Sequence, residues 1–365
     1  MARLLRHRAI GDPRPRRHGE PVARLLQEGQ PDPPRDRGGQ LMPAYRKHRF
    51  AASIREQVRP LYQSNNWRGG VAVLGDYAVI ALAAAGGARW PWLAPAAIFV
   101  IGSRQRALVT LLHDGVHLSL ARARWLNRFL TRWPAGFAVF QSDEYYRAIH
   151  VPAHHGHLGD PQRDPDYVGF RESGLLAVTS SRAFLSGFFF KTLLLGNALG
   201  NVRELVAGRI AYMAGKRGDL ARLAAAQAVV AAALSWLAGP LGYLWFWLVP
   251  FLTVSHVLAW FLEITEHYRL FGEDRSELEI TRNRFPCWWE RCFFGMHGET
   301  WHLTHHLFPG VPFWNLRRVH EILLQDDAYR AANAARGGLL SAPAGRVSIL
   351  REILDDIDRT HWRPL

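Results

Sequence analysis

The chain has 365 residues, of which 48% are hydrophobic and 14 are tryptophan, a content that is high for a soluble protein. A formal net charge of +14 suits nucleic acid, anionic lipid or an acidic protein partner, but no recognisable nucleic-acid-binding motif accompanies it. Two cysteines, Cys287 and Cys292, exclude a disulfide framework and a four-cysteine zinc site. The mean hydropathy of -0.11 despite so many basic residues indicates that apolar and basic residues lie in separate stretches, as in membrane proteins.

The first 41 residues differ in composition from the rest of the chain. Residues 1–41 are dense in Arg, Pro and Gly and have little periodic apolar content, so we expect a disordered basic tail. The tail has no apolar core of the kind found in a secretory signal. Met42 begins a better organised stretch and is an alternative start of translation. Residues 42–365 are expected to form one membrane domain.

Four apolar stretches are long enough, with their flanks, to cross a membrane. Trp90 and Trp92 are placed to anchor one end of the second stretch, 90–112, at the interface. Gly239-Pro240 separates the third stretch, 221–238, from the fourth, 242–266. A further apolar piece, 183–200, is interrupted by Lys191 and is expected to lie along the interface. The predicted fold is therefore an all-α integral membrane protein with four transmembrane helices in two hairpins. The expected spans are residues 70–87, 90–112, 221–238 and 242–266.

The basic residues predict how these spans are oriented. One connector between paired spans holds only Arg89 and the other holds no charge, whereas both tails and the middle section carry nearly all the Arg and Lys. Because basic segments stay on the cytoplasmic side, the tails and the middle section are expected to form a cytoplasmic helical cap. The predicted location is the inner (cytoplasmic) membrane, with every histidine cluster facing the cytoplasm.

Nine of the 17 histidines fall in four places at the predicted cytoplasmic ends of the spans. HDGVH and WHLTHHLFP place histidines at i, i+3 or i+4, on one face of a helix. HVPAHH offers an i, i+4 pair, His150 and His154, with a neighbour, and a single histidine ends the last span in TEHY. The candidate metal ligands are His113, His117, His150, His154, His155, His267, His302, His305 and His306.

So many imidazoles indicate more than one metal ion. Zinc is generally satisfied by four ligands, so nine histidines imply two ions. A site of nitrogen ligands without thiolates suits iron, copper, nickel or zinc, and redox chemistry with dioxygen is the obvious use of two irons. Nearby side chains are expected to orient the imidazole N–H groups. The candidates for this role are Asp114, Glu263, Glu266, His157 and His297.

Two further histidines have alternative interpretations. His256 lies inside the last span and either faces a functional cavity or packs as a neutral, hydrogen-bonded side chain. His320 belongs to an amphipathic segment that is expected to cover the site with Ile322 and Leu323 inward, and a ligand role is not favoured.

HDGVH, HVPAHH and WHLTHHLFPGVP resemble the three histidine boxes of the membrane fatty acid desaturase superfamily, bacterial type, whose members are non-haem di-iron enzymes. DPQRDPDY after the second box and HLFPGVPFWNL after the third are also similar to connecting sequence in that family. The resemblance runs from about Asn65 to Leu323. It implies a four-span membrane protein with a cytoplasmic cap, two iron ions held by the nine histidines, and O2 as co-substrate.

The sequence also departs from the family pattern. The second box has three residues before its HH pair where many members have two, and HGET stands where many members have an Asn ahead of the third box. No fused haem-binding or ferredoxin-like segment is visible, so the resemblance implies a separate electron donor, a ferredoxin or similar protein with its reductase.

The activity that the resemblance implies is an oxidoreductase acting on paired donors, which reduces O2 to water and introduces a double bond into an alkyl chain. A fatty acyl lipid is the expected substrate. The same boxes occur in hydroxylases and ketolases of lipids or carotenoids, and in desaturases of small amino-acid-derived compounds such as dihydrorhizobitoxine. A metal transporter is a rival of another class, but its ligands should lie within the spans, where only His256 is found.

Overall fold

The computed structural model describes residues 45–359 except 217 and 273–274, so the predicted tail, 1–41, lies outside the described residues. The described part of the chain is helical, with two isolated β-bridges and no strand, which confirms the predicted all-α class. The α-helices are α2 (Ala52–Val58), α3 (Arg68–Arg89), α4 (Ala94–Val116), α5 (Arg124–Arg132), α6 (Asp143–Ala148), α7 (Pro165–Glu172), α8 (Ser181–Phe184), α9 (Phe190–Leu193), α10 (Ala198–Arg203), α11 (Ala211–Ala214), α12 (Asp219–Ala238), α13 (His256–Glu266), α14 (Trp288–Phe294), α15 (His302–Leu307), α16 (Phe313–Leu323), α17 (Asp327–Asn333) and α18 (Ile349–Arg359).

Shorter helical segments of other types join or extend these helices. The π-helices are η4 (Ile149–His155), η6 (Leu185–Phe189), η7 (Glu204–Ile210), η8 (Leu244–Leu248) and η9 (Phe251–Ser255). The 3₁₀ segments are η1 (Arg59–Tyr62), η2 (Pro91–Leu93), η3 (Phe137–Val139), η5 (Leu175–Ala177) and η10 (Met296–Trp301).

Three helices are long and apolar enough to cross a membrane: Arg68–Arg89, Asp219–Ala238 and Leu244–Glu266. They coincide with three of the four predicted spans. The helix in the position of the remaining predicted span, α4, does not belong to this set, because Arg104-Gln105-Arg106 interrupts its apolar stretch. The hairpin of the last two spans turns at Gly239, whose φ of 83° is readily accessible only to glycine.

The apolar piece predicted to lie along the interface forms part of a bent pair of helices, Ser181–Leu193 and Ala198–Ala214. The two helices meet at 62° and together are apolar enough to form a broken span or a re-entrant loop. The break contains Leu195 at a φ of 61°, a left-handed conformation that stops a right-handed helix. The piece is therefore not one continuous helix, and its position along the interface stays a prediction.

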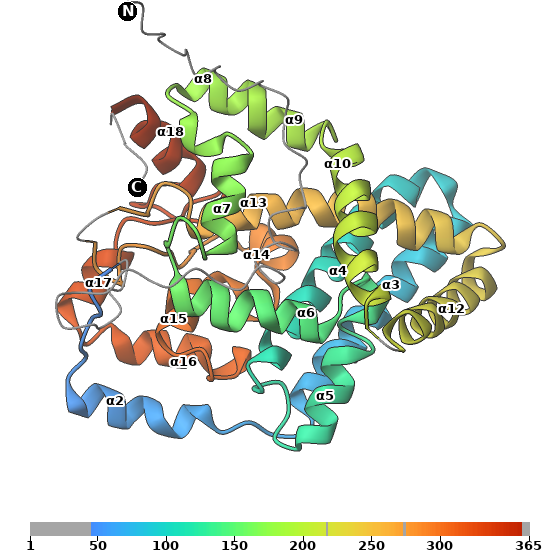
Figure 1. Ribbon diagram of the computed structural model, residues 1–365, viewed down its shortest axis with the longest axis horizontal. Helices are drawn as coiled ribbons and strands as arrows, with labels where there is room; N and C mark the ends of the chain where they lie inside the picture. Colours follow the sequence, from blue (N-terminus) through green and yellow to red (C-terminus); the bar gives the residue numbers. More distant parts are fainter. Residues whose placement is uncertain (1–44, 217, 273–274, 360–365) are drawn as a thin grey trace, which may run out of the picture.

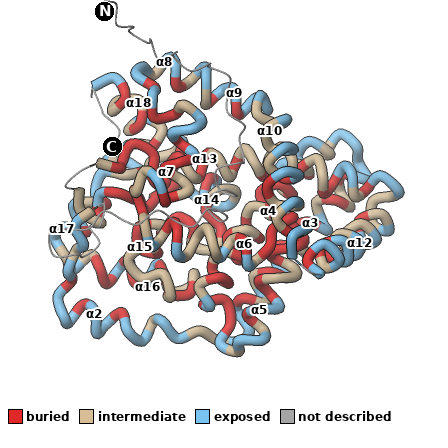
Figure 2. The backbone as a smooth tube through the Cα atoms, viewed as in Figure 1, coloured by how far each residue is buried: buried red, intermediate tan, exposed pale blue. Residues whose placement is uncertain are grey.

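The core is built around α4, which packs against α3, η9 and α13. Ile101, Leu108 and Leu111 of α4 are fully buried, and Gly102 lets the helix approach η9 so closely that a Cβ would lie 2.5 Å from Val254. Buried positions concentrate in this central region, whereas α12 presents many exposed ones (Figure 2). The outward side chains of α12 include Trp236, which is 87% exposed, as expected for a surface that faces lipid.

The same central helices bring the histidine clusters together. α4, α6 with η4, α13 and α15 converge in the middle of the molecule (Figure 1). α16 packs against α15 with Ile322 and Leu323 buried, which confirms the predicted amphipathic covering helix.

Candidate metal centre

The nine histidines that the sequence predicts as ligands come together in two adjacent groups, and no other histidine of the described residues joins them. Within each group, one ligand atom from every member lies within 4.8 Å of those of the others. The first group consists of His113, His117, His150, His155 and His305, and the second consists of His154, His267, His302 and His306.

The middle histidine cluster divides between the groups because it lies on the π-helix η4. Residues i and i+5 are brought together in a π-helix, so His150 pairs with His155, and their Nε2 atoms are 3.0 Å apart. His154 joins the second group, with its Nε2 atom 3.3 Å from that of His306. The i, i+4 pairing of His150 with His154 is therefore wrong. Pro152, which has no N–H to donate, stands inside this π-helix.

A single turn of α15 contributes histidines to both groups. His305 Nε2 lies 3.1 Å from His155 Nε2 in the first group, whereas His306 Nε2 lies 3.0 Å from His302 Nε2 in the second. The His155 and His306 rings stack with their centroids 4.3 Å apart. The two groups thus form one continuous cluster.

Two helix ends complete the groups. His113 lies in the last turn of α4 and His117 follows it as the C-terminal cap, while His267 caps α13 with its Nε2 atom 2.9 Å from that of His302. Helices that end at the cluster hold these rings on rigid backbone, while α13 and α4 extend away from it.

The ring nitrogens fit a metal in spacing and in chemistry. Two ligands bound at about 2.1 Å and at right angles are about 3.0 Å apart, close to the separations of the Nε2 pairs. The Nε2 atoms of His113 and His117 are buried without a hydrogen-bond partner, and such an atom costs free energy unless something binds it. A donor set of nitrogen alone suits iron, copper, nickel or zinc.

Burial keeps most of these rings in the neutral form that binds metal. Burial, followed by repulsion from His113, lowers the pKa of His117 to about 2, and burial lowers the pKa of His267 to about 3. The same cause lowers the pKa of five other rings well below the usual range: His150, His155, His302, His305 and His306.

His154 is the exception, because two carboxylates flank it. Burial opposes its protonation, but Asp166 and Asp164 outweigh burial and raise the pKa of His154 to about 9. Asp164 Oδ1 lies 2.9 Å from His154 Nδ1, and Asp164 Oδ2 accepts a 2.8 Å hydrogen bond from Gly159 N–H. An acceptor at Nδ1 points Nε2 towards the second group and makes it a better ligand. Neither acid is among the residues predicted from the sequence, although both stand in DPQRDPDY just after the second box.

Two of the predicted supporting carboxylates lie against candidate ligands. Asp114 Oδ1 is 3.4 Å from His113 Nδ1 and its other oxygen accepts a 2.9 Å hydrogen bond from Phe313 N–H. Glu266 Oε1 is 3.6 Å from His302 Nδ1, beyond hydrogen-bond length. Both carboxylates are thus placed to interact with the rings electrostatically.

The remaining predicted candidates are positioned differently. Glu263 lines a cavity beside the cluster. His297 also lines this cavity, and its Nε2 atom is 2.7 Å from Asp76 Oδ2. His157 belongs to neither histidine group. His320 stacks on Trp301 and shares a 2.8 Å hydrogen bond with a tyrosine hydroxyl, which makes it a structural residue.

Comparison with known proteins agrees with this geometry. A family model described as fatty acid desaturase matches residues 88–335, a range that contains all nine histidines. The chain belongs to the fatty acid desaturase family. It is 33% identical over 333 residues to dihydrorhizobitoxine desaturase of Bradyrhizobium elkanii, a match that covers 88% of this chain and 94% of the relative. It is 25% identical over 278 residues to sn-1 oleoyl-lipid 12-desaturase of Picosynechococcus sp., covering 70% and 74%. The predicted family resemblance is confirmed.

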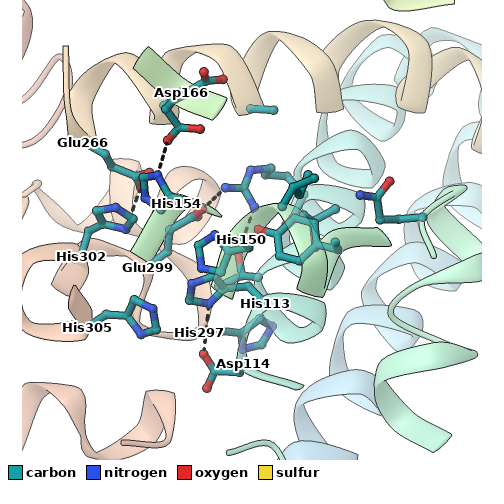
Figure 3. A pocket seen from close by; sticks show the side chains of 18 of the residues that line it. His113, Asp114, His150, His154, Asp166, Glu266, His297, Glu299, His302 and His305 are labelled. Carbon is teal, nitrogen blue, oxygen red and sulfur yellow. Dashed lines mark hydrogen bonds and ion pairs between the residues drawn. The ribbon is translucent and has the colours of Figure 1, made fainter. Parts of the chain in front are cut away.

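This desaturase has a cavity of about 260 Å³ that opens directly against the histidines (Figure 3). Five of the histidines form part of its wall: His113, His150, His154, His302 and His305. The wall also contains the carboxyl groups of Asp114, Asp166, Glu263, Glu266 and Glu299 and the guanidinium groups of Arg106 and Arg209. Charged and polar side chains therefore share this wall with apolar ones, among them Val109, Ile149 and Phe251.

His256 reaches this cavity from inside the last apolar helix, in agreement with the cavity-facing interpretation of the sequence. Its Nδ1 atom is 2.6 Å from the carbonyl oxygen of Phe251, so Nδ1 carries the proton that this acceptor requires. The Nε2 atom is then an acceptor, and it is buried without a partner.

Proposed function

We propose that this protein is an O2-dependent, membrane-bound desaturase with two non-haem iron ions held by the two histidine groups. The observation that carries this proposal is the convergence of all nine histidines into groups of five and four, in a chain of the desaturase family. The overall reaction takes one CH2–CH2 unit, O2, two electrons and two protons, and yields a CH=CH unit and two water molecules. When bound, the irons supply the oxidant that removes hydrogen from an unactivated carbon.

The protein's own residues hold the site in place and keep it dry. Asp164 orients His154, the carbonyl of Ile280 accepts from Nδ1 of His267 at 3.1 Å, and Asp114 lies beside His113. These contacts fix which nitrogen of each ring faces the cluster. α16 packs over α15, which limits access of water from that side. A substrate carbon held in the cavity would lie next to both groups.

For the topology, we propose four spans, formed by α3, α4, α12 and the helix Leu244–Glu266. The supporting observations are three helices of suitable length and hydropathy, and an α4 that leads from the paired connector to the histidines. The positive-inside bias then places the histidine groups on the cytoplasmic side of the inner membrane. Electrons are proposed to come from a separate ferredoxin-like protein, for which the exposed Arg317 and Arg318 of α16 are a candidate contact.

The substrate classes to consider are a small compound and an acyl lipid. The relative with the higher identity and coverage is named for dihydrorhizobitoxine, and the more distant one for an oleoyl lipid. On this ground we propose a small compound as the first candidate and an acyl lipid as the second. A hydroxylase is the third candidate, since it needs the same histidine groups but transfers oxygen to the carbon.

The proposal is tested with the full chain purified in detergent from bacterial membranes. We expect two iron ions per chain and, with O2, a reductase and a ferredoxin, a product that has lost two hydrogens. Mass spectrometry of the products of both substrate classes makes the measurement. An oxygenated product without a new alkene would contradict desaturation, and a zinc-loaded protein that remains inactive after iron loading would contradict the di-iron centre.

The same experiment addresses a metal transporter. A transporter is expected to place ligands along a path through its spans, whereas these groups lie at the ends of α4 and α13. Iron that stays bound through purification and reacts with O2 is incompatible with simple transport.

A further inference from the structure

The side chains around the cavity beside the histidines include polar atoms without a hydrogen-bond partner. Five residues that line the cavity, all outside the histidine groups, each have one such buried atom. These atoms are Arg106 Nε, Gln141 Oε1, His256 Nε2, Glu266 Oε1 and Glu299 Oε2. Because an unpaired buried polar group costs free energy, a concentration of such groups around one cavity indicates a polar ligand.

Most of these unpaired atoms are acceptors. The oxygens of Gln141, Glu266 and Glu299 accept, and so does His256 Nε2, because its other ring nitrogen carries the proton. Only Arg106 Nε is a donor. A ligand that satisfies this wall must bring several N–H or O–H groups, and a hydrocarbon chain brings none.

The charges of the wall point to the same kind of ligand. Arg106 is already paired with Glu299, and Arg209 is paired with Glu204 at 3.0 Å. Glu266 Oε1 has no hydrogen bond, but it lies 3.5 Å from the guanidinium group of Arg284. Glu263, by contrast, has no ion-pair partner among the described residues. It lies one turn before Glu266 on α13, and both face the cavity. An ammonium group placed here would pair with the carboxyl group of Glu263 and donate to the acceptors around it.

A larger space with a more apolar wall, which suits an acyl chain better, lies elsewhere. A separate groove of about 540 Å³ runs between α4, α9 and the last apolar helix, with an almost entirely hydrocarbon wall that includes Phe99, Leu193 and Phe261. None of the nine histidines belongs to that wall. The cavity at the histidines has only about 260 Å³, at or below the lower end of ligand sites, which usually have about 300–1,000 Å³.

From these observations we infer that the cavity binds a small, amine-bearing substrate of amino-acid type, with its ammonium group against Glu263 and its anionic group near the free N–H of Arg106. The inference rests on the proposed function, because it names the substrate class of that site. The aliphatic part of the substrate then points to the histidines that form the other wall.

Binding is measured directly, by isothermal titration of the iron-loaded, detergent-purified chain. The probes are L-norleucine, N-acetyl-L-norleucine, hexanoate, and dioleoyl phosphatidylcholine in mixed micelles. We expect L-norleucine to bind at least about tenfold more tightly than the two probes without an ammonium group, a difference of about 1.4 kcal/mol. Equal affinity for L-norleucine and hexanoate would overturn the inference, and so would binding of the phospholipid alone.

Variants locate the amine contact. Glu263→Gln should weaken L-norleucine binding at least about tenfold while hexanoate binding changes less than about twofold. Glu263→Asp, which keeps the charge, should retain the preference for the amine even if Glu263→Gln fails to fold. Glu56→Gln makes the same chemical change on the exposed face of α2 and should leave all affinities unchanged. If Glu263→Gln instead lowers iron content and leaves the amine preference intact, Glu263 balances metal charge and the inference is wrong.

Failure of this inference can be separated from failure of the proposed function. Iron content and O2-dependent alkene formation are measured on the same preparation. A chain that desaturates the phospholipid equally well with and without Glu263→Gln keeps the function and overturns the amine-bearing substrate. A chain that prefers L-norleucine but contains no iron and forms no alkene keeps the binding site and overturns the desaturase.

Discussion

The polar cavity and the apolar groove lie on two sides of the same helix, α13. Ala259, Glu263 and Glu266 face the cavity at the histidines, whereas Leu258 and Phe261 face the groove. The spacing is that of two helix faces, because residues three or four apart share one side. α13 therefore has an apolar groove on one face and, on the other, the cavity that contains the charged side chains.

The long apolar stretches of the sequence contribute more to one of these two spaces than to the other. The apolar residues that stand out in the sequence cover α3, α12 and the groove, where they meet lipid or one another. The cavity at the candidate metal centre is lined by apolar side chains together with charged and polar ones. A high apolar content of the chain thus does not by itself identify the substrate.

The largest effect is expected from removing a histidine that belongs to the first group and also lines the cavity. His305→Ala should lose iron from the first group and lower product formation more than about a thousandfold, since metal assistance is worth several kcal/mol. Iron analysis and product mass spectrometry make the test. His320→Ala removes another buried histidine, and it should keep its iron because His320 belongs to neither group. Loss of iron in both variants would show general misfolding instead.

A smaller effect is expected from changing a residue that contacts a candidate ligand but is not itself one. Asp164→Asn keeps the shape of the side chain but removes the negative charge that orients His154. Loss of such a supporting carboxylate typically costs about 10–100-fold in metal affinity or activity. Iron affinity is measured by competition with a chelator. Unchanged affinity would mean that Asp164 only caps α7, where its side chain accepts from Asp166 N–H.

Adding bulk to the cavity in one variant and to the groove in another tests which of the two spaces holds the substrate. Ala259→Met adds bulk to the cavity and should lower turnover of an amine-bearing substrate about tenfold or more, because overpacking costs about 1–3 kcal/mol. Leu193→Trp adds bulk to the groove at a half-exposed position and should change that turnover less than about twofold. The opposite result, with the groove variant inactive, would make the groove the substrate channel.

The smallest effect concerns His320, a buried histidine outside both regions. Burial, followed by the positive charge of Arg346, lowers the pKa of His320 to about 4, against a weaker opposite effect of Glu321. The folded state therefore favours the neutral ring, and its contribution to stability is present above about pH 6.5 and declines as the pH falls towards 4, by at most about 3 kcal/mol. The ring shares its hydrogen bond with Tyr329, which has no negative charge to offset the loss.

The measurement is the free energy of unfolding of the detergent-purified chain at pH 7 and pH 5. His320→Asn should lose less stability between these two values than the natural chain. The other buried histidines are common to both proteins, so the difference isolates His320. Equal losses would mean that His320 does not carry the pH dependence.

Much of the site could be predicted because the histidines follow local rules. His302, His305 and His306 are close in sequence, and a helical turn brings them together whatever the rest of the chain does. Their division between two groups could not be predicted in this way. It depends on which helix end faces each ring, and His155 and His305 are 150 residues apart.

The residues that support the histidines could likewise be predicted only where they are adjacent in sequence to a ligand. Asp114 was predictable because it is adjacent to a ligand, but Asp164 is ten residues from His154 and meets it only through the turn that follows η4. The π-helix was also missed, since Pro152 and the histidines around it carry no clear signal for a turn of i, i+5.

The sequence by itself determined that this chain is helical, predicted four apolar spans of which three are long apolar helices in the structure, and showed nine histidines at the spacing of the desaturase family. Local periodicity and hydropathy suffice for these features, because each depends on residues within about one helix length. The tertiary structure alone decided how the histidines divide and where the unpaired acceptors gather. Gln141, His256 and Glu299 come from three distant segments, and only their packing around one cavity makes them a candidate binding site.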